Sequence, residues 1–285
     1  MRSRATSCSS TQQQPDATAR RRSAALAGLA AGRRPPRNLL LAVLGAIVAL
    51  AWASLWWLEQ WPGGAQFHVH GIGEHARHGA ASGWLRAGTF LAGWLLMTVA
   101  MMLPTTVPLV VRFRAMVARH PHPALLVSLL LAGYAAAWLA FGTLVLALLR
   151  AAEFGQARLG WLSGEAWAVL LLATAGAFQF SPLKYACLAR CRTPLGFLMS
   201  HWHGRRAHAE ALGTGWWHGL YCVGCCWALM LLMFAMGTLS LTAMLLLALV
   251  MAAEKNAPWG QRLGRPLGVG LLGLAAGLGL YQLAA

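Results

Sequence analysis

A histidine and three cysteines lie close together in one strongly apolar segment, His218-Gly-Leu-Tyr-Cys222-Val-Gly-Cys225-Cys226. An α-helix turns by about 100° per residue, so these four side chains fall within an arc of about 100° on one helix face. Thiolates and thioethers are soft ligands that favour Cu(I), and zinc competes where cysteine combines with histidine. The segment therefore predicts a soft-metal site made of His218, Cys222, Cys225 and Cys226.

Methionine sulfur atoms extend this chemistry. Met233 and Met236 continue the same stripe along the helix, and Met97 and Met101 share one face of a second apolar segment, just before Pro104. Methionine is also a common packing residue in cores. Met97 and Met101 are accordingly interpreted as accessory ligands, with core filling as the alternative.

A second pair of cysteines, Cys187 and Cys191, follows Ser181-Pro182 in a basic stretch. Proline suits the first position of a helix, so a helix is expected to begin here and to place both thiols on one face. Nearby lysine and arginine side chains favour the thiolate. We interpret the pair as a relay at the cytoplasmic side that exchanges metal with the deeper cysteines; the alternative is a short interfacial helix with ordinary thiols.

Two other functions fit the same cysteines. Cys222-Val-Gly-Cys225 is a Cys-x-x-Cys sequence, which is typical of a thiol–disulfide oxidoreductase, although the βαβ pattern of thioredoxin-like proteins is missing. Alternatively, the protein is a structural membrane subunit whose cysteines only pack. The sequence contains no phosphate-binding loop and no hydrolase motif, which argues against an ATP-driven pump and favours a protein that is not an enzyme.

The remaining ionisable groups are given simpler interpretations. A loop with His68, His70, Glu74, His75 and His78 is expected to be solvated rather than a defined metal site. The pair Glu254-Lys255 is interpreted as an interfacial charged pair at the end of a membrane span.

The elements that position these residues follow from composition. The chain has 285 residues, of which 58% are hydrophobic and 11% are charged. A soluble domain is far less apolar, whereas several stretches here are long enough to cross a bilayer. The predicted fold is an all-α, polytopic transmembrane helix bundle of about seven spans, at residues 38–58, 84–111, 124–149, 161–180, 216–236, 238–253 and 266–284.

The net charge of +16 is concentrated in the N-terminal arm and in short loops. This distribution follows the positive-inside rule and places the N-terminus in the cytoplasm. It also argues against nucleic acid as a partner. The expected partners are the lipid bilayer and a protein that donates or receives the metal. Residues 1–37 are predicted to be a disordered basic arm and 38–285 the transmembrane domain, whose first span is a retained anchor.

Several of these motifs together resemble one bacterial family, the domain-of-unknown-function 2182 family, over about residues 90–275. Its members are described as predicted metal-binding integral membrane proteins, and some carry a copper-chaperone label. The resemblance implies a multi-pass protein of the bacterial inner membrane that handles Cu(I) by chaperoning, delivery or passage. It is carried by Ala100-Met101-Met102-Leu103-Pro104, Ser181-Pro-Leu-Lys184 with Cys187 and Cys191, the segment His218–Cys226, and Glu254-Lys255.

Overall fold

The structure, a computed structural model, describes residues 37–60, 83–159, 164–234 and 241–284. Within these ranges the chain forms helices and no strands, which confirms the predicted all-α class. The helices are α2 (Arg37–Gln60), α3 (Gly83–Met116), α4 (Pro123–Leu159), α5 (Gly164–Phe178), α6 (Pro182–Arg192), α7 (Pro194–His201), α8 (Ala207–Leu231), η2 (Leu232–Phe234), α9 (Leu241–Asn256), η3 (Gly260–Leu263) and α10 (Gly264–Ala284).

Five stretches of helix in the described ranges are long and apolar enough to cross a membrane, and they involve α2, α3, α4, α8 and α10. A sixth would be α5 with α6, which are bent by 65° at the break between them. The predicted span at 238–253 corresponds to α9, which has 16 residues and is short for a crossing. The fold is therefore compatible with a multi-pass membrane protein, while the count of seven spans stays a prediction.

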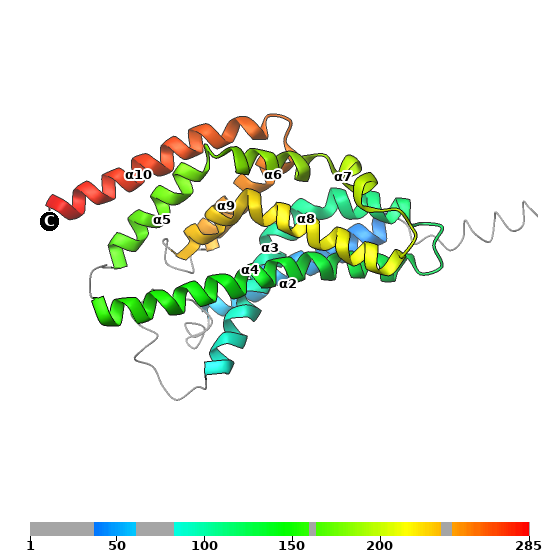
Figure 1. The fold of residues 1–285 in the computed structure, drawn as a ribbon, viewed down its shortest axis with the longest axis horizontal. Coiled ribbons are helices and arrows are strands. Elements are labelled where there is room, and N and C mark those ends of the chain that lie inside the picture. The colour runs from blue at the N-terminus through cyan, green and yellow to red at the C-terminus, as the bar shows by residue number, and fades with distance from the viewer. Residues whose placement is uncertain (1–36, 61–82, 160–163, 235–240, 285) are drawn as a thin grey trace, which may run out of the picture. The chain divides into compact units, whose positions relative to one another are not determined.

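The closest helix pair is α4 with α8, which run side by side in Figure 1. A Cβ atom added at Gly133 would overlap the backbone of Leu212, and one added at Gly215 would overlap the backbone of Leu130. Small residues let two backbones approach in this way, and dispersion contacts then stabilise the pair in a membrane protein. The close approach fixes α8, which carries the cysteines, against α4.

Helix α3 continues through Pro104 and Pro108. Because Pro104 has no N–H, it cannot donate to the carbonyl of Ala100, four positions earlier. The indole N–H of Trp52 in α2 donates to this carbonyl instead, at 3.1 Å. A neighbouring helix thus supplies the missing hydrogen bond, as is usual for proline inside membrane helices.

The predicted helix start at Ser181-Pro182 is confirmed. Ser181 is the N-cap of α6, its side chain accepts a hydrogen bond from the Leu183 N–H, and Pro182 occupies the first turn. The segment 181–215, which lies between two predicted spans, is built from α6, α7 and the beginning of α8. Helix α6 packs against both α8 and α9, which brings its cysteines to the helix that carries the other three.

The outer helices expose the apolar side chains that lipid contact requires. On α10, Val269, Leu274 and Leu280 are each more than half exposed, and exposed tryptophans lie near the end of α2 and the beginning of α3. Tryptophan at helix ends is typical of the membrane–water interface. The exposed surface of the described helices is thus consistent with a bilayer environment.

Candidate metal centre

Helix α8 holds its three cysteines in the interior, where Cys222, Cys225 and Cys226 are each about 1% exposed. The thiols of Cys225 and Cys226 both donate to the carbonyl of Cys222, at 3.1 and 2.9 Å. These local bonds satisfy the thiols inside the helix and hold them on one side of it. The predicted stripe is therefore a buried feature, and the three side chains do not face lipid.

Two further helices contribute groups to the same place. The hydroxyl of Tyr134 in α4 lies 3.1 Å from the Sγ atom of Cys222. The Sδ atom of Met102 in α3 lies 3.7 Å from the Sγ atom of Cys226. Met102 is fully buried, so its thioether is directed into the bundle. Helices α3 and α4 thus bring a thioether and a hydroxyl to the thiols of α8.

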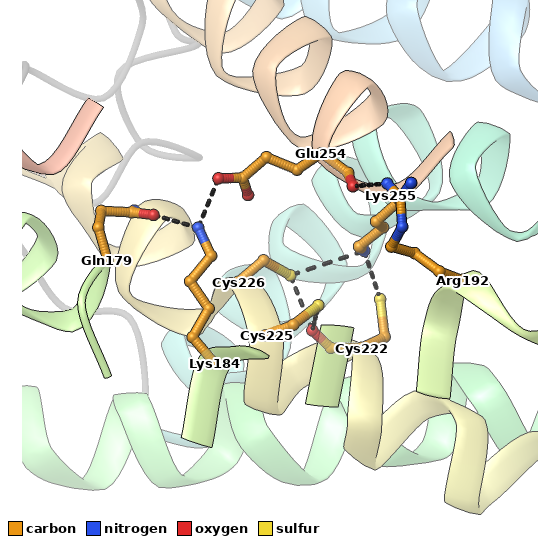
Figure 2. A network of polar contacts seen from close by, with 8 residues as sticks. All are labelled: Gln179, Lys184, Arg192, Cys222, Cys225, Cys226, Glu254 and Lys255. Carbon is orange, nitrogen blue, oxygen red and sulfur yellow. Dashed lines mark hydrogen bonds and ion pairs between the residues drawn. The ribbon is translucent and has the colours of Figure 1, made fainter. Parts of the chain in front are cut away.

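Lys255 in α9 brings a positive charge to a group of three sulfur atoms, those of Cys222, Cys226 and Met102, which we call the sulfur cluster. Figure 2 shows its contacts with the two cysteines. Its Nζ atom lies 2.9 Å from the Sγ of Cys222, 3.8 Å from the Sγ of Cys226 and 3.4 Å from the Sδ of Met102. The hydroxyl oxygen of Thr105 is a fourth neighbour at 3.4 Å. The ammonium thus marks a point on which all three sulfur atoms converge.

A buried ion pair lies beside the cluster. Lys184 in α6 donates to a carboxylate oxygen of Glu254 at 2.5 Å and also to the side-chain oxygen of Gln179. Arg192 donates to the backbone carbonyls of Glu254 and Pro258, at 2.5 and 3.3 Å. Figure 2 shows Lys184 and Arg192 of α6 both reaching Glu254, near the end of α9. They fix the backbone from which Lys255 extends toward the sulfur atoms.

This arrangement corrects the interpretation of Glu254 and Lys255 as an interfacial charged pair. The two residues are only 2% and 6% exposed, and they point to different partners. Lys184 is fully buried as well and is paired with Glu254. Buried ionisable groups in an apolar bundle indicate a functional site. The sequence signal for them is that Lys184, Glu254 and Lys255 lie in or beside apolar segments.

The cysteines of α6 lie directly against α8. The Sγ atom of Cys187 would be 2.6 Å from a Cβ atom added at Gly224, so the lack of a side chain at Gly224 makes room for this thiol. The thiol of Cys191 interacts with that of Cys225, which also interacts with Cys222 and Cys226. Cys187 and Cys191 are therefore neighbours of the α8 cysteines, and none of these five residues forms a disulfide.

His218 is buried one turn before Cys222, with its ring against the rings of Tyr134 and Phe197. Its Nδ1 atom has no hydrogen-bond partner, which leaves a nitrogen donor available close to the thiols. Met101 and Met233 are buried in the surrounding core and Met97 is packed against it. Of the methionines, Met102 is the one within hydrogen-bonding distance of a cysteine in the described ranges, and the sequence interpretation overlooked it.

In the described part of the chain, no three or more His, Cys, Asp or Glu side chains are already grouped so that they could hold a metal ion. Structural zinc is almost always held by four such ligands, whereas soft thiolate and thioether ligands select Cu(I). The thiols of Cys222 and Cys226 with the thioether of Met102 are donor atoms of the soft kind. The histidine loop at residues 68–78 and Met236 lie outside the described residues.

Comparison with known proteins shows the family of the chain. Residues 91–278 match the model of a protein family that is described as PpoB2, copper chaperone. The matched range includes the sulfur cluster, both cysteines of α6 and the ion pair of Lys184 with Glu254. No curated protein and no solved structure matches the chain.

Proposed function

Because the chain belongs to the PpoB2 copper chaperone family, we propose that it binds Cu(I) inside its helix bundle and delivers the ion to a partner protein. The proposed setting is the bacterial inner membrane, which the long apolar helices fit. The observation that carries the proposal is the convergence of the sulfur atoms of Cys222, Cys226 and Met102 on the position of the Lys255 ammonium. Soft donors at one buried point suit a soft ion.

In this proposal the sulfur cluster holds the ion, and the cysteines of α6 form the route by which it arrives or leaves. Cys225 interacts both with Cys191 and with the thiols of Cys222 and Cys226, so it links the two sets. Cu(I) moves between them by ligand exchange, in which the next sulfur binds before the previous one is released. Each thiol loses its proton when it binds the ion and regains one on release.

The lone nitrogen of His218 supports its inclusion as a further ligand. Its Nδ1 atom is buried and has no hydrogen-bond partner. A role as a metal ligand would explain why this nitrogen is left without one. The aromatic rings on either side of His218 hold the imidazole in place. The four residues of α8 thus keep the role that their spacing predicts, with Met102 as an added ligand from α3.

Elemental analysis of the full-length protein tests this function. The protein is purified in detergent after anaerobic incubation with Cu(I), and copper per chain is measured by mass spectrometry. We expect one copper ion per chain in the wild type and little in the Cys222→Ser/Cys226→Ser variant. Cys8→Ser is the control, since Cys8 lies in the predicted N-terminal arm. Equal copper contents in all three proteins would contradict the proposal.

The same samples distinguish the thiol–disulfide alternative. A metal-binding protein retains its copper while its thiols remain reduced, as a thiol titration shows after the copper is removed. An oxidoreductase instead forms a reversible bond between two of its cysteines without any metal. Mass spectrometry of alkylated peptides identifies any such pair and would replace the copper proposal with the redox one.

A further inference from the structure

Lys255 is buried without a carboxylate partner in the described ranges. Its Nζ atom contacts two thiols, one thioether and one hydroxyl. The carboxylate of Glu254, its neighbour in sequence, is instead paired with Lys184 at 2.5 Å. The hydroxyl of Thr105 donates to the carbonyl of Met102 at 2.8 Å, so it offers the ammonium only its lone pairs.

An unbalanced charge in a water-poor interior is costly, because neither a high dielectric nor salt screens it. Lys184 and Glu254 cancel one another, and Arg192 is directed to backbone carbonyls. Among the described groups in contact with the Lys255 ammonium, the thiols of Cys222 and Cys226 are the ones that can become anions and balance its charge. Cysteine can supply it as thiolate, whereas Met102 is always neutral.

We propose that Lys255 restricts the sulfur cluster to a monovalent soft cation. This inference rests on the proposed function, because it assumes that Cys222 and Cys226 bind the ion. When both bind Cu(I) as thiolates, the two thiolates with the ion carry one net negative charge. The ammonium of Lys255 cancels this charge. A divalent ion neutralises the whole negative charge of the two thiolates. The positive charge of the ammonium is then uncompensated and repels the ion.

The position of Lys255 also requires that its side chain moves when the ion binds. The ammonium lies within 3.8 Å of all three sulfur atoms, where the ion would sit. A lysine side chain has a flexible stem of four carbons, so the ammonium can move away from the sulfur atoms while its charge remains nearby. The hydroxyl oxygen of Thr105 lies 3.4 Å from the ammonium and can continue to accept a hydrogen bond from it after the shift.

Silver(I) and cadmium(II) test the proposal, since both are soft, thiolate-binding ions that differ in charge. The full-length protein in detergent, without reductant and under anaerobic conditions, is titrated with each ion against a chelator of known affinity. We expect the wild type to prefer Ag(I), and Lys255→Gln to lower the ratio of Ag(I) to Cd(II) affinity by about tenfold or more. Lys255→Arg keeps the charge and should keep most of the preference.

Arg262→Gln is the matched control, because it removes an exposed positive charge from η3 and should leave the ratio unchanged. Circular dichroism and gel filtration check that each variant is folded. An unchanged ratio of Ag(I) to Cd(II) affinity in Lys255→Gln would overturn the inference. A wild type that binds Cd(II) as tightly as Ag(I), with Cys225 as a third thiolate, would also overturn it. The Cys225→Ser variant tests whether that thiolate takes part. If Cys222→Ser/Cys226→Ser binds Ag(I) as the wild type does, the proposed function itself fails.

Discussion

The thiol of Cys226 in α8 lies 3.7 Å from the thioether of Met102 in α3, although 124 positions separate the two residues in the sequence. Both side chains are almost completely buried. The contact joins the apolar segment with the cysteines to the segment with the methionines. It also distinguishes Met102 from Met97 and Met101 in the same helix, so the role of its sulfur atom can be tested by substitution.

Met102→Leu is expected to weaken Cu(I) binding by about tenfold, because it removes one soft ligand and keeps the volume of the side chain. Met101→Leu is the matched control, since Met101 is equally buried in the same helix and has no such contact with a thiol. Competition with a Cu(I) chelator measures both affinities. Similar losses in the two variants would show that the methionines act only through packing.

Cys191→Ser is expected to slow copper uptake more than it lowers the final copper content. Cys191 interacts with Cys225 but is not part of the sulfur cluster, so its loss interrupts the route and leaves the site. Cys187→Ser should act in the same direction, because this thiol lies against α8 at Gly224. Stopped-flow transfer from a Cu(I) chelator gives the rates, and elemental analysis gives the occupancy. Rates and occupancies that fall in parallel would argue against a relay.

Glu254→Gln is expected to lower the free energy of unfolding by about 3–5 kcal/mol, because it leaves the charge of Lys184 buried without its partner. The double variant Lys184→Met/Glu254→Gln removes both charges and should recover much of this loss. Denaturant unfolding in detergent, followed by circular dichroism, compares the three proteins. A double variant as unstable as Glu254→Gln alone would mean that the pair does not act as a unit.

Gly215→Ala is expected to destabilise the bundle by about 1–3 kcal/mol, because the new methyl group overlaps the backbone of Leu130 and separates α4 from α8. Gly213→Ala is the control in the same helix, where a Cβ atom meets nothing within 4 Å. That substitution should stabilise the protein by about 0.4–1 kcal/mol, since alanine restricts the unfolded chain and favours a helix. Thermal unfolding of both variants decides whether close packing of the two helices matters.

The Gly215→Ala change should also weaken copper binding, because Tyr134 in α4 contacts Cys222 and moves with its helix. A destabilised variant that binds copper as tightly as the wild type would show that the cysteines of α8 hold the ion without support from α4. Cu(I) competition at a temperature where both glycine variants are folded makes this comparison.

The sequence by itself determined the helical class, the presence of several long apolar helices and the helix start at Ser181-Pro182. These features depend on local composition and on spacing along one chain segment, which a helix converts directly into a face. For the same reason the sequence identified His218, Cys222, Cys225 and Cys226 as neighbours. Their role as metal ligands stays a prediction for experiment.

Only the tertiary structure decided which distant groups join them. Met102 rather than Met97 or Met101 reaches Cys226, and Glu254 and Lys255, adjacent in sequence, face different partners. Which side of one helix meets which side of another depends on packing between segments, such as the close approach of α4 and α8 at Gly133 and Gly215. A local sequence pattern does not determine such a contact. Glu254 and Lys255 were therefore predicted to be interfacial, whereas the fold buries both.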